Sequence, residues 1–139
     1  IKNRVEIFGE QPILNEQDQK IGEDPYFLPA ATDLDLEAAA KLVETHNGVC
    51  WPAHIDRDAN GLLAVLGFFP PEPVFRIAEL RDRENRKLAE DRAVVVCSDA
   101  HRLWEIGEAG GSLELDVADD ADPVTVRHAL FTKLREGTL

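Results

Sequence analysis

The chain has 139 residues, of which 44% are hydrophobic, so it is long enough for one hydrophobic core and too short for several large domains. Its 27 acidic and 15 basic side chains give a formal net charge of -12, which disfavours direct binding to nucleic acid or to anionic membranes. No apolar run reaches the about 20 residues of a membrane span, and no signal-peptide pattern opens the chain. We therefore expect a single cytoplasmic domain over residues 1–139.

The amino terminus and the cysteines carry two further expectations. The chain begins at Ile1 and contains no methionine, so we expect it to be a piece of a longer polypeptide. Cys50 and Cys97 are too few for a disulfide framework, and each falls within an apolar segment. We expect both to be small core residues in a reducing compartment rather than redox groups.

The first third of the sequence predicts a strand, a long loop and a helix. Arg4–Phe8 alternates charged with apolar side chains and is followed by Gly9, as expected of a strand. Glu10–Pro29 is polar and interrupted by proline and glycine, which predicts a long loop with a hairpin near Asp18–Gly22. Apolar residues recur at helical spacing in Asp33–Asn47 after an aspartate that can cap the first turn, which predicts a helix.

The middle of the chain alternates apolar runs with breaks. Gly48–His54 is a short apolar run that ends in a proline and a histidine, and Val74–Leu80 is a second strand candidate. Between them, Gly61–Phe69 predicts a short helix or turn, and the prolines of Gly67–Pro73 predict a rigid surface loop. The charged segment Arg81–Arg92 indicates a solvated helix.

The last third contains two strand candidates and a closing helix. Ala93–His101 opens with consecutive β-branched residues, which is typical of a strand buried on both faces. Arg102–Gly107 has room for one or two helical turns, and Ser112–Val117 alternates as a strand does. Asp122–Arg135 begins with an aspartate cap and a proline and is followed by Gly137, which predicts an amphipathic helix.

Taken together, the elements indicate an α/β fold. About five strands are joined by helical or loop crossovers, which is typical of a parallel sheet or of part of a barrel. A closed barrel of this kind needs more strands and more residues, so this length suffices for about half of one.

The candidate site residues follow two of the predicted strands. Asp99 and His101 come at the end of one apolar run, and His54 ends the other. The carboxyl ends of parallel strands meet at one edge, and two imidazoles with one carboxylate suit one face of a divalent metal ion. A buried Asp–His pair with an unrelated histidine, or the mononuclear iron site of an oxygenase, are alternatives. His46 and His128 are expected on the surface, and the acidic run at 116–122 lacks the spacing of a calcium loop.

Two motifs carry a resemblance to a known family. PAHIDR, Pro52–Arg57, and SDAH, Ser98–His101, resemble the polymerase and histidinol phosphatase superfamily, abbreviated PHP. The likeness extends over most of the chain up to about Leu115, and the chain also resembles a branch of uncharacterised bacterial PHP proteins. The other segments that carry it are Ile1–Gly22, Ala31–Gly48 and Leu62–Pro71.

The resemblance implies a distorted TIM-like barrel of seven βα units with a site of two or three metal ions at its mouth. The chain would be the carboxyl-terminal portion of this barrel, with the first strands absent. His54, Asp99 and His101 match family metal ligands, and zinc, manganese or iron suits such ligands. The early His-x-His pair of the family has no counterpart in this sequence.

The function implied is that of a metal-dependent phosphoesterase acting on a small phosphorylated substrate. Asp99 would also orient a bound water, and Arg57 would clamp the phosphate unless it pairs with Asp56 or Asp58 on the surface. We expect the 139-residue chain by itself to be inactive, because the other ligands are missing. The alternative is an interaction or assembly module that forms a homodimer through exposed sheet edges.

Overall fold

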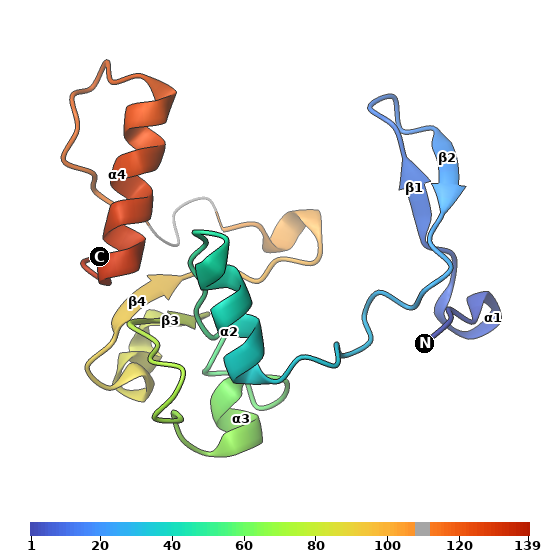
Figure 1. The fold of residues 1–139 in the computed structure, drawn as a ribbon, viewed down its shortest axis with the longest axis horizontal. Helices are drawn as coiled ribbons and strands as arrows, with labels where there is room; N and C mark the ends of the chain where they lie inside the picture. The colour runs from blue at the N-terminus through green and yellow to red at the C-terminus, as the bar shows by residue number, and fades with distance from the viewer. Residues whose placement is uncertain (108–111) are drawn as a thin grey trace. The chain divides into compact units, whose positions relative to one another are not determined.

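The computed structural model describes residues 1–107 and 112–139, which fall into two compact units, Ile1–Asp35 and Leu36–Leu139 (Figure 1). The expectation of a single domain over residues 1–139 stays a prediction. Within the described residues, every helix is too short or too polar to cross a lipid bilayer.

The first unit opens with a helical turn where the sequence predicts a strand. Helix α1 spans Val5–Phe8, so the strand prediction for Arg4–Phe8 is wrong. The amides of Phe8 and Gly9 donate to the carbonyls of Arg4 and Val5, each at 2.9 Å, which pairs backbone groups that a lone strand would leave open. The ring of Phe8 stacks on Phe27, with the ring centroids 4.2 Å apart.

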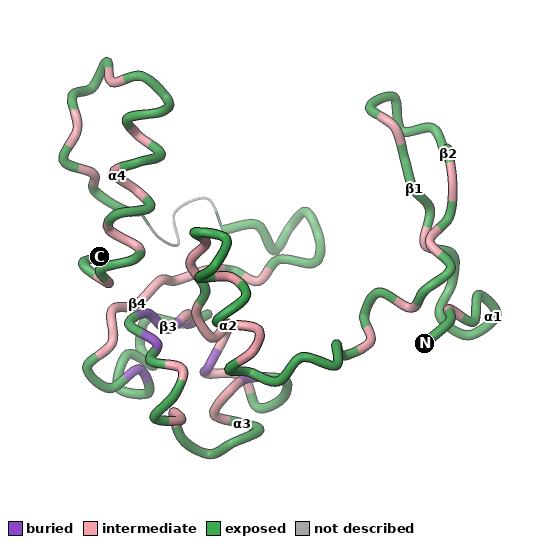
Figure 2. Tube along the Cα trace, viewed as in Figure 1, coloured by how far each residue is buried: buried purple, intermediate pink, exposed green. Residues whose placement is uncertain are grey.

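A β-hairpin follows in the predicted loop. Strands β1, Pro12–Leu14, and β2, Lys20–Glu23, pair antiparallel, which confirms the hairpin expected near Asp18–Gly22. The Asn15 side chain closes the turn by accepting hydrogen bonds from the amides of Gln17 at 3.0 Å and Gln19 at 2.9 Å. Among residues 1–35 no side chain is buried, so hydrogen bonds rather than a core hold this unit (Figure 2).

The second unit carries the predicted helices and the parallel strands. The helices expected in Asp33–Asn47, Gly61–Phe69 and Asp122–Arg135 are confirmed, and the charged segment Arg81–Arg92 forms a 3₁₀ helix. In chain order the elements are α2 Leu36–Thr45, α3 Leu62–Leu66, β3 Ile77–Leu80, the 3₁₀ helix η1 Arg83–Ala89, β4 Ala93–Val96, the 3₁₀ turn η2 Leu103–Glu105 and α4 Pro123–Glu136.

The two strands of this unit are parallel neighbours. β3 pairs with β4 in register from Ile77 opposite Ala93 to Leu80 opposite Val96. The predicted α/β class is thereby confirmed. In the described part of the chain, however, the strands form two separate two-stranded sheets and no closed barrel.

A third segment runs along the other side of β3. The amide of Glu79 donates to the Pro52 carbonyl at 3.0 Å, and the amide of Ile55 donates to the Glu79 carbonyl at 2.9 Å. This order of bonds is that of a parallel neighbour with one extra residue. The strand predicted over Gly48–His54 is therefore wrong as a regular strand, because Pro52 has no amide to donate and His54 has a positive φ of 33°.

The hydrophobic core gathers around β3 because this strand has neighbours on both sides. Ala78 and Leu80 of β3 form a buried cluster with Ile55 and Ala89 from the adjoining segments, and Phe75 and Ile77 are also buried (Figure 2). The partly buried side chains packed against this core are Leu62, Leu63, Phe69 and Val94.

Two further strand expectations need correction. β4 is half-buried rather than buried on both faces, and in the described part of the chain β3 is the only strand that pairs with it. Residues Ser112–Val117 form no strand, since an alternating segment needs a partner edge and the described residues supply none.

The core generates a stability prediction. Leu80 is fully buried on the central strand, so Leu80→Ala should lower the free energy of unfolding by about 3 kcal/mol, measured by urea denaturation. Leu103→Ala is the matched control, because Leu103 is 85% exposed, and it should change the stability by less than about 0.5 kcal/mol. Equal effects of the two substitutions would contradict the central position of β3.

Candidate functional site

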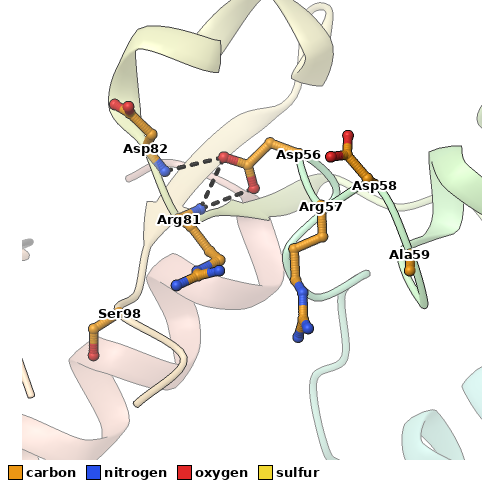
Figure 3. A pocket seen from close by; sticks show the side chains of 7 residues that line it. All are labelled: Asp56, Arg57, Asp58, Ala59, Arg81, Asp82 and Ser98. Carbon is orange, nitrogen blue, oxygen red and sulfur yellow. Dashed lines mark hydrogen bonds between the residues drawn. The ribbon is translucent and has the colours of Figure 1, made fainter. Parts of the chain in front are cut away.

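An open pocket of about 610 Å³ lies at the carboxyl ends of the parallel segments. Arg81 and Asp82 follow β3, Ser98 follows β4, and Asp56, with its neighbours in the loop, follows the segment bonded to the other side of β3. Figure 3 shows the lining residues, which are Asp56, Arg57, Asp58, Ala59, Arg81, Asp82 and Ser98. The pocket therefore occupies the edge of the sheet where the sequence predicts a site.

Asp56 fastens this loop to the end of β3. Its carboxylate accepts hydrogen bonds from the amides of Arg81, at 3.0 and 3.2 Å, and Asp82, at 3.0 Å, and from the side-chain amide of Asn85, at 3.0 Å. Burial alone raises the pKa of Asp56, but these donors outweigh it and hold the pKa below its ordinary value. Asp56 is thus an ionised structural group and not a proton donor.

Arg57 and Asp99 join the two motif segments. Arg57 Nη1 lies 2.8 Å from Asp99 Oδ2, and 33% of the arginine side chain and 21% of the aspartate side chain are exposed. Arg57 therefore pairs with neither Asp56 nor Asp58, the partners that the sequence offers as alternatives. Asp99 has a positive φ of 51°, a conformation that costs energy in a residue other than glycine and is often found at functional sites.

His101 lies next to Asp99 with its ring largely exposed. Its Nδ1 is 2.7 Å from the backbone carbonyl of Asp99 and 3.9 Å from the Oδ1 atom of the same residue. A carbonyl only accepts hydrogen bonds, so Nδ1 is the donor in this contact, which leaves Nε2 outside it. The hydrogen bond from Nδ1 to the Asp99 carbonyl is of the kind that orients metal-binding histidines. The backbone amide of His101 donates to Glu105 at 2.9 Å.

His54 sits in a tightly packed turn on the other side of β3. A Cβ atom added to Gly61 would lie 2.9 Å from the His54 carbonyl, so this turn requires glycine at position 61. The Glu79 carboxylate accepts hydrogen bonds from the His54 amide at 3.3 Å and from the Trp51 ring nitrogen at 3.4 Å. The Nδ1 atom of His54 is buried and has no hydrogen-bond partner in the described structure.

The three predicted metal ligands fit a metal ion in kind but do not complete a site. Asp99 and His101 are brought together, yet within residues 1–107 and 112–139 no three His, Cys, Asp or Glu side chains form a group that could hold a metal ion. The unpaired Nδ1 of His54 and the orientation of His101 are suitable for ligation. One Asp99 oxygen is held by Arg57. These residues can therefore provide only part of a metal centre.

The cysteines lie outside this chemistry. Burial, and then the Glu79 carboxylate, raise the pKa of the Cys97 thiol, which keeps it protonated and unreactive. Burial, and then Glu44, raise the pKa of Cys50. Cys50 is nevertheless an exposed residue, so its predicted core position is wrong, because the strand that would have buried it does not form.

Sequence reasoning missed Arg81 and Ser98, which line the pocket. Arg81 directly follows β3, and Ser98 lies one residue before Asp99. The signal that drew attention to Asp99, a polar residue just after an apolar run, was available for both.

No family model, no curated protein and no solved structure matches this chain.

The Asp56 hydrogen bonds generate a prediction about pH. Asp56→Asn should lower the free energy of unfolding at pH 7 by about 1 kcal/mol, because a charged acceptor of several donors is lost. Since folding lowers the pKa of Asp56, its contribution is present above about pH 4 and disappears as the pH falls through the folded-state pKa. Urea denaturation at several pH values should therefore show the difference from the unsubstituted protein shrinking in acid.

Asp58→Asn is the control for this prediction. Asp58 lies in the same loop, and its carboxylate has no hydrogen-bond partner in the described structure. If Asp56→Asn and Asp58→Asn destabilised the protein equally, or if the Asp56 effect persisted unchanged in acid, the structural role of Asp56 would be refuted.

Proposed function

We propose that this chain is part of a metal-dependent phosphoesterase of the PHP type, to which it contributes His54, Asp99 and His101 as metal ligands and Arg57 as a phosphate-binding residue. The observation that carries the proposal is the Arg57–Asp99 ion pair of 2.8 Å. It joins the two motif segments on which the family resemblance rests, beside a pocket at the carboxyl ends of parallel strands.

The parallel segments support the barrel that this proposal requires. The segment at 52–55, β3 and β4 are consecutive in the chain and adjacent in space, and the bonds on both sides of β3 are parallel. Consecutive parallel neighbours are the arrangement of a βα barrel, whose functional groups lie at the carboxyl ends of the strands. We propose that these three segments are successive strands of a larger barrel.

The chemistry divides between the metal and the side chains. Zinc, manganese or iron ions would supply an activated hydroxide and positive charge for the leaving oxygen. Arg57 presents a planar guanidinium whose donors match phosphate oxygens, and its bond to Asp99 holds it at the pocket. The Asp99 carboxylate would orient a water through the oxygen that Arg57 does not bind. A small phosphorylated substrate suits the pocket, whereas the net charge of -12 disfavours a polyanion such as nucleic acid.

An assembly role is the second candidate, favoured by the surface beside the site. No strand pairs with the outer edge of β4 in the described part of the chain. Leu103, Trp104 and Ile106 follow that strand and are 85%, 76% and 59% exposed. An open strand edge and apolar side chains are features that a second copy of the chain could cover.

Metal content tests the first candidate. The purified chain, exposed to excess zinc or manganese and then desalted, should retain metal by elemental mass spectrometry. His101→Ala should weaken the metal affinity about tenfold or more, because a ligand is lost. His128→Ala is the matched control, because His128 lies on the exposed face of α4, and it should leave the affinity unchanged.

The proposal that this chain supplies metal ligands would be contradicted if His101→Ala and His128→Ala retained equal amounts of metal, or if none of the three proteins retained any. Sedimentation of the same samples separates the second candidate. A dimer at micromolar concentration without bound metal favours assembly, whereas a monomer with bound metal favours the phosphoesterase.

A further inference from the structure

We propose that Arg81, acting with Arg57 and Ser98, binds the phosphoryl group of a small phosphorylated ligand at the carboxyl end of β3. The choice of a phosphoryl ligand rests on the proposed function, but the site requires no metal ion. Arg81 would be a binding residue additional to those that the sequence motifs indicate.

The backbone of Arg81 is held in place. It follows Leu80, which is fully buried on β3, and its amide donates to both oxygens of Asp56. The guanidinium, in contrast, has no hydrogen bond or ion pair with any described residue. A long cationic side chain on a fixed base, with all its donors free, is suited to a ligand from solution.

The donors of the pocket share one side. In Figure 3 the guanidinium groups of Arg57 and Arg81 and the Ser98 hydroxyl extend toward the lower part of the view. The carboxylates of Asp58 and Asp82 extend toward the upper part. The Asp58 and Asp82 carboxylates therefore face away from the two guanidinium groups, while the Asp56 carboxylate is bonded to the backbone amide of Arg81.

The Asp56 and Asp82 carboxylates accept hydrogen bonds from backbone amides. Asp56 accepts the bonds that hold the end of β3, and Asp82 accepts a hydrogen bond of 2.9 Å from the Glu84 amide at the start of η1. Their charges are partly balanced by these N–H groups. They therefore oppose an anion at the arginines less than free carboxylates would.

Arg57 keeps most of its capacity for a second partner. Its bond to Asp99 involves one Nη1 donor, and a guanidinium has five N–H groups. Asp99 balances the charge of Arg57, whereas the positive charge of the Arg81 guanidinium has no ion-pair partner among the described residues. That charge, two planar forks and a hydroxyl suit a tetrahedral phosphoryl group better than a planar carboxylate, which one fork satisfies.

The test measures phosphate binding without metal. The full chain, freed of metal on a chelating resin, is titrated with inorganic phosphate and with phenyl phosphate at low ionic strength, and binding is followed by ³¹P NMR. Arg81→Gln should weaken binding of both ligands about tenfold, because a charge-assisted contact is lost. Arg81→Lys should fall between the two proteins, since it keeps the charge but not the fork.

Arg83→Gln is the matched control. Arg83 lies two residues further on at the start of η1, is exposed, and has no side-chain partner in the described structure. It removes the same charge and should leave phosphate affinity within about twofold of the unsubstituted protein. Thermal denaturation of both glutamine variants should give the same midpoint, which shows that a loss of binding is not a loss of folding.

The outcomes separate this inference from the metal proposal. Equal effects of Arg81→Gln and Arg83→Gln, or no saturable binding of either ligand, would overturn the phosphoryl site. Phosphate binding that depends on Arg81, in a chain that retains no metal, would support the phosphoryl site. It would contradict only the proposal that this chain binds a metal ion. Tighter binding of phenyl phosphate than of phosphate would identify an ester as the natural ligand, and equal binding would identify the free phosphate group.

Discussion

The second unit depends on the hydrogen bonding of β3 on both sides. On one side, the backbone of Glu79 forms hydrogen bonds with Pro52 and Ile55. On the other side, the carbonyls of Arg76 and Leu80 accept hydrogen bonds of 3.0 Å from the amides of Ala93, the first residue of β4, and Cys97, which directly follows β4. Both edges of β3 thus have hydrogen-bonded neighbours, and the buried apolar side chains of the described residues all lie on β3 or on segments near it. Burial of this strand thus holds three separate chain segments together.

The same pairing places the pocket. Because the three segments run parallel, the residues that follow them emerge at one edge, where Asp56 bonds to the backbone after β3 and Arg57 bonds to Asp99 after β4. Asp56 serves structure and Arg57 serves the site, although they are adjacent in the sequence. The position of the polar residues therefore depends on the apolar strand β3. His54 and Asp99, which both have a positive φ, lie near the points where their segments end at this edge of the sheet.

Sequence reasoning succeeded where local chemistry decides the structure. The aspartate cap and the following glycine predicted α4, and consecutive β-branched residues predicted β4. It failed where a partner decides: Arg4–Phe8 and Ser112–Val117 alternate like strands but have no edge to pair with in the described structure. The proximity of Asp99 and His101 follows from their spacing, whereas the choice of Asp99 as the partner of Arg57 depends on long-range pairing that spacing does not encode.

The central claim is that a metal ion binds at the carboxyl end of this sheet, and paramagnetic broadening tests it most directly. Substoichiometric Mn²⁺ is added to the ¹⁵N-labelled chain, and the amide signals that disappear first are identified by NMR. We predict that His54, Asp99 and His101 broaden first, while His128 on α4 stays sharp. Broadening centred on the acidic run at 116–122, or spread evenly over the acidic surface, would contradict the account.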